Sequence, residues 1–234
     1  VFLWADGRVA PGFPHSLGAR AKAGPSFADA DGDGRPELLV GDEKGRVHAL
    51  KKNGREAKGW PASVGSAVTS SVSSARFAGG PSFAVGCQDG RVHVLDAQGR
   101  ERPGFPLKTD FEVTGAPAFA DLDDDGSMDL VVASQDFKLY AVNGKGEPLP
   151  GFPVAAGYRL YEGPAVADLD GAGRLAVVFA SADGQLYAVD QGGAPLPGFP
   201  VRVGPRLFGG VAVAAVGRDG GRVGGGGHTD GQGG

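Results

Sequence analysis

Two short acidic segments carry the residues best suited to chemistry in this chain. Residues 29–37 read DADGDGRPE and residues 121–129 read DLDDDGSMD, so both place a carboxylate at the first, third, fifth and ninth positions and a glycine at the sixth. Such oxygen-rich loops suit a hard cation such as Ca²⁺, which takes six to eight oxygens at about 2.3–2.6 Å. Because unneutralised carboxylates this close repel one another, the pattern predicts a bound cation in each segment.

The predicted ligands are the four carboxylates of each segment and the backbone carbonyl of its seventh residue. They are Asp29, Asp31, Asp33, Arg35 and Glu37 in the first segment, and Asp121, Asp123, Asp125, Ser127 and Asp129 in the second. The twelfth position holds Val40 or Val132 where an EF-hand loop would have glutamate, so the ninth residue has to close the site. Turn preference alone explains one Asp-Gly pair, but not four carboxylates within nine residues twice.

Two other segments at the same place in the pattern have lost these carboxylates. Residues 168–176 keep only the first and third, Asp168 and Asp170, and residues 74–80 have none. We therefore expect two good metal sites, and weak binding or none at residues 168–176.

A repeated tetrapeptide, Pro-Gly-Phe-Pro, reveals the elements that position these segments. Counting the variant Lys-Gly-Trp-Pro, its glycines stand at residues 12, 59, 104, 151 and 198, with spacings of 47, 45, 47 and 47 residues. A fixed period of this length indicates an array, a solenoid or a propeller. Most periods hold a short apolar stretch, an acidic turn and two further β-prone runs, followed by the tetrapeptide.

The β-prone runs alternate with period two between Gly, Asn and Asp turns, which predicts strands and hairpins, and no window shows helical periodicity. The predicted strands are residues 25–28, 116–120 and 163–167, then 37–41, 129–133 and 175–179, then 46–50, 91–95, 138–142 and 185–189. Proline in the fourth element suits an outer edge strand, where a missing N–H costs little. The expected fold class is all-β, a β-propeller of four-stranded blades.

We expect about four complete repeats plus a partial fifth. Residues 1–11 match the tail of a repeat and residues 205–216 match its front, so the two termini together supply close to one further period. They could share a fifth blade that closes the ring, or the chain could be a piece of a larger propeller. The expected domains are a propeller over residues 1–217 and a Gly-rich flexible tail over residues 218–234.

The motif Ala-Asp-Leu-Asp-x-Asp-Gly at residues 120–126, followed by Leu-Val-Val-Ala and Leu-Tyr-Ala-Val, resembles the FG-GAP/VCBS-type repeats of integrin α-subunit propellers and bacterial surface proteins. The resemblance covers residues 1 to about 216. It implies calcium in the acidic turns and a role in adhesion or recognition, in a secreted or cell-surface protein. The chain departs from that family in two of its four turns, and its blade count falls short of the family's usual seven.

Composition and isolated reactive residues argue against several other functions. The net charge of −4 is scattered, which predicts no nucleic-acid partner, and no apolar run is long enough for membrane insertion. The single cysteine, Cys87, excludes an intrachain disulfide and reads as a small buried thiol. His48 and His93 stand where other repeats have tyrosine, so we expect them to fill space and make hydrogen bonds. No nucleophile elbow occurs, and we expect no catalytic residues.

The leading hypothesis is a non-catalytic, calcium-binding propeller for scaffolding or for recognition of a protein or glycan ligand, within a larger chain. A second hypothesis is an accessory propeller of a secreted peptidase or glycosidase whose active site lies outside this chain. A third is a quinoprotein-class enzyme, since Leu-Tyr-Ala-Val-Asn-Gly-Lys-Gly partly resembles those repeats. The third is disfavoured because those blades carry a recurrent tryptophan, and here Trp occurs only at residues 4 and 60.

Overall fold

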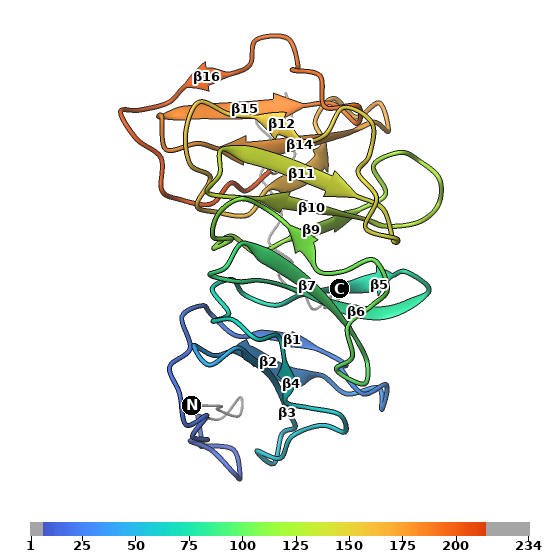
Figure 1. The fold of residues 1–234 in the computed structure, drawn as a ribbon, viewed down its shortest axis with the longest axis vertical. Coiled ribbons are helices and arrows are strands. Elements are labelled where there is room, and N and C mark those ends of the chain that lie inside the picture. Colours follow the sequence, from blue (N-terminus) through green and yellow to red (C-terminus); the bar gives the residue numbers. More distant parts are fainter. Residues whose placement is uncertain (1–6, 214–234) are drawn as a thin grey trace, which may run out of the picture.

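The computed structural model describes residues 7–213, and all regular structure in that range is β. Sixteen strands form four antiparallel sheets of four strands each. Within every sheet the strands lie side by side in chain order, and the sheets follow one another as separate layers (Figure 1). The all-β prediction with four-stranded blades is confirmed, and we number the blades one to four along the chain.

The bounds of the strands follow the repeat. Blade one holds β1 (Ser26–Ala28), β2 (Glu37–Gly41), β3 (Arg46–Leu50) and β4 (Ala62–Ser63). Blade two holds β5 (Ser73–Phe77), β6 (Gly80–Gly86), β7 (Arg91–Asp96) and β8 (Leu107–Lys108). Blade three holds β9 (Ala118–Ala120), β10 (Asp129–Ala133), β11 (Lys138–Val142) and β12 (Val154–Ala155). Blade four holds β13 (Ala165–Asp168), β14 (Leu175–Ala180), β15 (Gln185–Val189) and β16 (Val201–Arg202).

The fourth strand of each blade is only two residues long and directly follows the repeated tetrapeptide. The bond between its aromatic residue and the next proline is cis in all five copies. Because proline has no N–H to donate, this segment can pair on one side only. It therefore forms the edge of the blade, as the sequence predicts.

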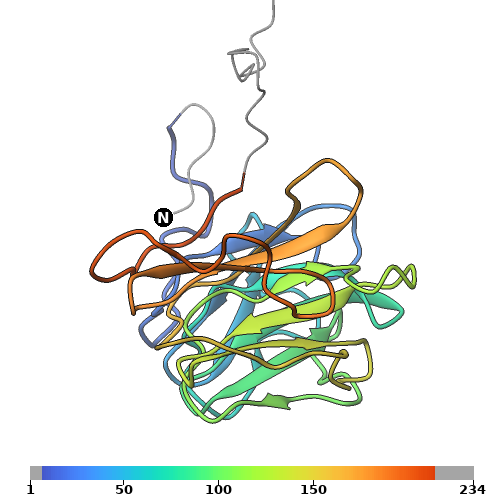
Figure 2. The same cartoon turned by 90° about the horizontal axis from the view of Figure 1, so that it is seen from above.

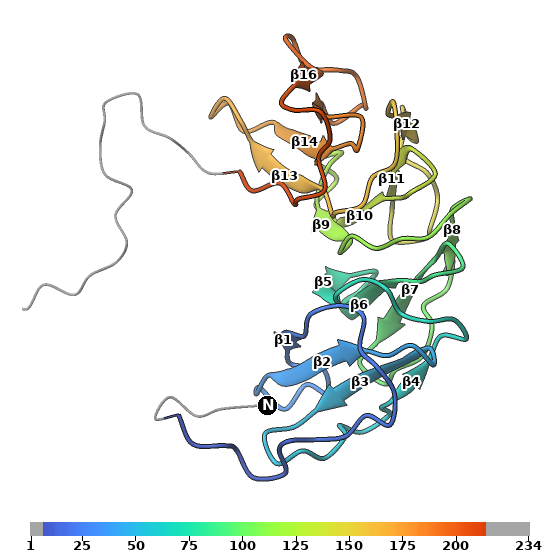
Figure 3. The same ribbon diagram turned by 90° about the vertical axis from the view of Figure 1, so that its left-hand side faces the viewer.

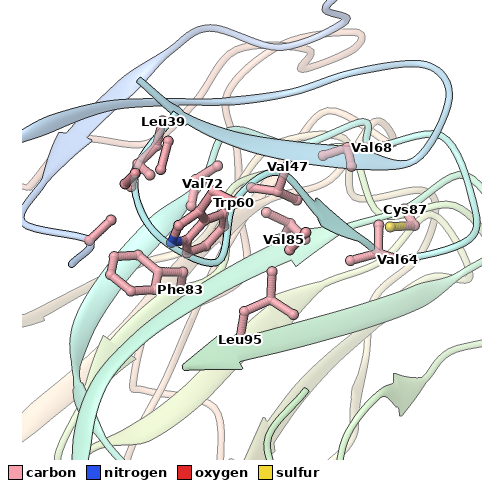
Figure 4. Close-up of a cluster of buried hydrophobic side chains, with 14 residues drawn as sticks. Leu39, Val47, Trp60, Val64, Val68, Val72, Phe83, Val85, Cys87 and Leu95 are labelled. Carbon is pink, nitrogen blue, oxygen red and sulfur yellow. The ribbon is translucent and has the colours of Figure 1, made fainter. Parts of the chain in front are cut away.

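Three hydrophobic cores hold the blades together, and each core lies between two neighbouring blades. In the first, Leu39 and Trp60 of blade one face Phe83 and Leu95 of blade two (Figure 4). The rings of Trp60 and Phe83 meet edge to face, with centroids 5.5 Å apart. Aromatic pairs of this geometry add to the free energy gained from burial alone. The tetrapeptide aromatics Trp60 and Phe152 are buried in these cores, so their predicted role in packing between blades is confirmed.

The glycines of the repeated tetrapeptide sit where the turn of one blade touches the next blade. Gly59 contacts the backbone of Gln98, Gly104 that of Lys145, and Gly151 that of Gly192, so closely that any Cβ would collide. Their φ angles lie between 82° and 91°, in the left-handed region that favours glycine. Each contact joins a tetrapeptide turn to the turn between the third and fourth strands of the following blade. Gly12 makes the same contact with Asn53 of blade one.

The blades form an open arc in the described part of the chain. Figure 3 shows the first part of the described chain, in dark blue, running along blade one, while blade four lies at the other end of the arc. No fifth sheet forms within residues 7–213, so the shared fifth blade is not seen there. Residues 1–6 and 214–217, which that blade also needs, and the predicted tail over residues 218–234 lie outside the described residues.

Cys87 is buried, as predicted, and directly follows β6. An isolated bridge pairs it with Val68. Burial raises the pKa of its thiol to about 12, with the charge of Asp89 adding to the effect. The thiol is therefore neutral and unreactive at physiological pH.

Candidate metal centres

The two acidic segments are loops that close the first hairpin of blades one and three. The first-blade loop (residues 29–37) joins β1 to β2, and its last residue, Glu37, pairs with Ala28 across the ladder. The third-blade loop (residues 121–129) joins β9 to β10, and Asp129 pairs with Ala120 in the same way. The matching registers give the two loops the same length and the same end points.

The first carboxylate of each loop shapes the loop itself. Asp29 accepts hydrogen bonds from the backbone N–H groups of Gly32 and Gly34, at 2.7 and 2.9 Å. Asp121 accepts from those of Asp125 and Gly126, at 3.1 and 3.0 Å. Such side-chain bonds to backbone N–H groups curl the chain around the carboxylate. In each loop three of the four predicted carboxylates thereby come close to one another.

The third-blade loop brings together Asp121, Asp123 and Asp129, which offer one oxygen each within 4.8 Å of one another. Asp129 is only 2 % exposed, and its Oδ2 accepts from the backbone N–H of Leu122 at 2.8 Å. Burial raises the pKa of Asp129 to about 6, against the Leu122 hydrogen bond and with the help of the neighbouring carboxylates. The loop therefore holds excess negative charge that a cation would relieve.

Asp125, predicted as a ligand, lies outside this group of three. Its Oδ1 accepts the backbone N–H of Ser127 at 2.7 Å, so the side chain orders the loop. None of the lysine or arginine ion pairs within residues 7–213 reaches Asp121, Asp123 or Asp129.

The first-blade loop gathers Asp29, Asp31 and Asp33 within the same 4.8 Å limit. Here the position of a cation is already taken, because Lys51 Nζ lies 2.5 Å from Asp31 Oδ2 and 2.9 Å from Asp33 Oδ2. The lysine holds the pKa of Asp33 below its usual value. Asp31 keeps a second oxygen, Oδ1, that is buried without a hydrogen-bond partner. The two loops thus share a backbone pattern but differ in charge.

Glu37, the predicted closing ligand of the first-blade loop, lies outside its cluster. It is 1 % exposed, and its Oε2 accepts the backbone N–H of Ala30 at 2.8 Å. Burial raises its pKa, and the charges of Asp31 and Asp33 add to the effect. No side-chain ligand is expected from Arg35, or from Ser127 in the other loop, since only their carbonyls were assigned a role.

Lys51 is the residue that sequence reasoning missed. It directly follows β3, and the ladder pairs Leu38 with Leu50 in blade one as it pairs Leu130 with Val142 in blade three. The residue of blade three that corresponds to Lys51 is therefore Asn143, which donates to Glu147 at 2.9 Å. Aligning the repeats beyond the acidic loops would have shown this difference.

The fourth-blade loop, residues 168–176, keeps the backbone clamp but little else. Asp168 accepts from Gly171 and Gly173 at 2.8 Å each. Asp170 pairs with Arg174 at 3.1 Å. With alanine at both remaining carboxylate positions, weak or absent metal binding remains the expectation.

Both histidines make hydrogen bonds, as expected. His93 Nδ1 lies 2.5 Å from Glu101 Oε2, whereas its Nε2 is buried without a hydrogen-bond partner. His48 Nδ1 lies 2.6 Å from Glu56 Oε1 and its Nε2 lies 3.3 Å from Asp42 Oδ2. At the corresponding positions, Tyr140 donates to Asp136 at 2.6 Å and Tyr187 donates to Asp183 at 2.9 Å. These contacts join the third strand to a neighbouring turn.

His48 is expected to make stability depend on pH. Burial disfavours the imidazolium, but the Glu56 and Asp42 carboxylates outweigh burial and raise the pKa of His48 above 6.5. A histidine whose pKa is higher in the folded than in the unfolded state stabilises the fold. This stabilisation is complete at a pH below the unfolded-state pKa, and it is lost as the pH rises through the folded-state pKa. In urea unfolding at pH 6 and pH 8.5, H48Q should lose less stability on going to pH 8.5 than the parent chain. The exposed-site control H15Q should behave as the parent, and equal losses in H48Q and the parent would contradict the assignment.

Comparison with known proteins supports the fold. No family model and no curated protein matches the chain. Among solved structures, BBS1N in complex with ARL6DN matches with a TM-score of 0.59 at 16% identity, over 80% of this chain and 56% of that one. BamB from Moraxella catarrhalis matches with a TM-score of 0.55 at 19% identity, over 77% of this chain and 49% of that one. The computationally designed Ika8 protein matches with a TM-score of 0.57 at 20% identity, over 78% and 49%.

BBS1N and BamB are β-propeller proteins, and the chain has the same kind of fold. It spans about half the length of these solved chains. Identities this low establish the fold alone. Within residues 7–213 there is no helix of the length and apolar character that crossing a membrane requires.

Proposed function

We propose that this chain is a non-catalytic, calcium-binding β-propeller module that recognises a protein or glycan ligand outside the cell. The observation that most directly supports this proposal is the third-blade group of Asp121, Asp123 and Asp129, which offer oxygens within 4.8 Å of one another. No lysine or arginine in the described chain forms an ion pair with them. Hard carboxylate oxygens on a tight loop are the donor set that Ca²⁺ prefers. Backbone carbonyls and water complete such sites, and the Ser127 carbonyl is the nearest candidate in sequence.

Calcium would brace the hairpin rather than take part in a reaction. The third-blade loop lies at one end of β9 and β10, and neutralising Asp129 removes the cost of a buried charge beside the first hairpin. Extracellular modules bind calcium at about 10⁻⁴–10⁻³ M, which suits a compartment rich in that ion. This fit supports the proposed secreted or cell-surface location.

A recognition role is supported by the kind of protein that shares the fold. BBS1N was solved in complex with ARL6DN, so a propeller of similar architecture takes part in a protein complex. His48 and the tyrosines at the corresponding positions of blades three and four each make a hydrogen bond to a carboxylate, which favours structural roles for these polar groups. Together these observations favour a binding module over an enzyme.

The test is a thermal melt with and without calcium. For a dissociation constant near 10⁻⁴ M, about 2 mM calcium should stabilise the fold by roughly 1–2 kcal/mol, which raises the melting temperature by about 2–8 °C for a chain of this size. D123N should abolish this gain because it removes one charge from the group of three. Magnesium at the same concentration should have a smaller effect, since it demands a near-ideal octahedron.

The matched control is D124N, one residue away in the same loop. Asp124 lies outside the group of three and accepts from Gln191 at 2.9 Å. Its φ of 58° is also tolerated by asparagine. D124N should keep the calcium response. A parent chain that melts at the same temperature in EDTA and in calcium would rule out the proposed site.

A further inference from the structure

The side of blade four that points away from blade three has the composition of a buried interface. In blade three the corresponding side packs into the third core against Val177 and Phe179 of blade four. The ladder aligns Val178 and Ala188 of blade four with Val131 and Ala141 of blade three. We call this side of blade four the outward face; besides those residues it includes Leu186, Leu196, Phe199 and, at its rim, Leu169 and Val201.

No blade covers the outward face. Leu169 is 42 % exposed, whereas its counterpart in blade three, Leu122, is fully buried. A groove of about 690 Å³ runs along this side, lined in part by Leu169, Leu196 and Phe199. Figure 2, which looks down the arc from this end, shows no further blade in front of blade four. Val178 and Ala188 are nevertheless buried within blade four, so the exposed part of the outward face is its rim, where Leu169 is 42 % and Val201 is 43 % exposed.

Two glycines show what is missing at each end of the arc. In the other repeats the tetrapeptide glycine touches the following blade, but no atom of residues 7–213 lies within 4 Å of the Cβ position of Gly198. The glycine between the third and fourth strands touches the preceding blade: the Cβ position of Gly193 lies 3.0 Å from Val154, and that of Gly99 lies 3.1 Å from Ala62. Gly7 has the same place in its repeat and a φ of 80°, yet in the described part of the chain it has no such neighbour within 4 Å.

Residues 7–22, the N-terminal segment, take the place of the end of a preceding blade beside blade one. Ala10 is buried, and Gly12 packs on Asn53 as the other tetrapeptide glycines pack on their neighbours. The backbone N–H of Glu43 donates to Arg20 O at 2.8 Å, which ties the segment to blade one. The segment corresponds to the last part of a repeat. In the order of the repeats it therefore belongs to the blade that would come after blade four. Within one chain the two surfaces lie at opposite ends of the arc (Figure 3).

The two surfaces also carry opposite charges. The N-terminal segment holds Arg8, Arg20 and Lys22, with His15 and no acidic residue, for a net charge of +3. The charged residues that line the groove of the outward face are Asp170, Asp190 and Arg174, and because Arg174 pairs with Asp170, the groove carries a net negative charge. Opposite charges around an apolar centre steer association and fix its register.

We infer that the outward face of blade four binds the N-terminal segment of a second copy of this chain, with Val201 against the Gly7 turn. The contact repeats the geometry of Val154 on Gly193 between blades three and four. The face and the segment are different surfaces, so the contact is head to tail, and two such contacts about a two-fold axis close a ring of two copies. The inference does not depend on calcium binding.

Mass measurement in solution tests the assembly. Light scattering after size exclusion at micromolar concentrations should give twice the chain mass of 23.6 kDa. The double variant L169K/V201K should return to the mass of one chain while circular dichroism and melting temperature stay those of a folded protein, because both positions are exposed. M128K, at a residue of blade three that is 41 % exposed, should still give the doubled mass.

Cross-linking tests the orientation. Under mild oxidation, the variant R8C/V201C should form disulfide-linked pairs of chains, because residue 8 adjoins the Gly7 turn. V201C alone should not. A parent chain with the mass of one copy, a cross-link within a single chain, or pairing through V201C alone would each overturn the inference. The first of these results would assign the face to a different occupant.

Discussion

F179A is expected to lower the free energy of unfolding by about 3–5 kcal/mol, the cost of removing a large buried aromatic ring. Phe179 is fully buried in the core between blades three and four, and its ring stacks on Tyr187 with centroids 5.1 Å apart. Truncation would leave a cavity bounded by strands of two blades. Urea unfolding followed by circular dichroism measures the loss.

The control is F208A, at a phenylalanine that is 56 % exposed. It should cost less than about 1 kcal/mol, because surface substitutions away from a core change stability little. If F179A and F208A lowered the free energy of unfolding equally, the core between blades would not hold the fold together.

We also expect a single unfolding transition, since Phe179 belongs to a core that two blades share.

K51M is expected to create a second strong calcium site. In the parent chain the Lys51 ammonium neutralises Asp31 and Asp33, so calcium has to displace it. A cation held at the same carboxylates opposes the binding of a second cation there. Removal of the ammonium should therefore strengthen calcium binding at the first-blade loop by about tenfold or more. Isothermal titration should show the number of tight sites rise from one to two.

K52M is the matched control, because Lys52 is the next residue, is exposed, and takes no part in the contacts of the first-blade loop. It should leave the number of tight sites at one. Two tight sites already present in the parent chain, or no gain in K51M, would show that Lys51 does not compete with the metal. In the absence of calcium K51M should be less stable than the parent chain, since Asp31 and Asp33 then lose their counter-charge.

The strands could be predicted closely from the sequence because the repeat presents the same pattern several times. The strands Glu37–Gly41 and Lys138–Val142 begin and end at the predicted residues. Glycine turns and alternating apolar residues are local features, so one chain segment is enough to specify them. The open arrangement of the arc was not predictable, because whether its two ends meet is decided between residues some 190 positions apart in the sequence.

The candidate sites were only partly predictable for the same reason. The carboxylates of each loop are close in sequence, and six of the eight predicted ones group as expected. They are Asp29, Asp31 and Asp33 in the first-blade loop and Asp121, Asp123 and Asp129 in the third-blade loop. Lys51 reaches the first loop only through the pairing of β2 with β3. Glu37 and Asp129 share a position and a backbone donor, yet only the shorter side chain joins its cluster. Whether a side chain reaches a cluster therefore depends on its length and on how the strands pair, neither of which the loop pattern shows.

The turn-on-turn contact of the tetrapeptide glycines has an evolutionary consequence. Each blade contacts the next through the same small set of backbone and apolar positions. Any two blades therefore have complementary contact surfaces. Unequal recombination between gene segments that encode adjacent repeats would add or remove one whole unit, and the new neighbours would still fit. Ring size in such a lineage can change in whole steps without any intermediate that fails to pack.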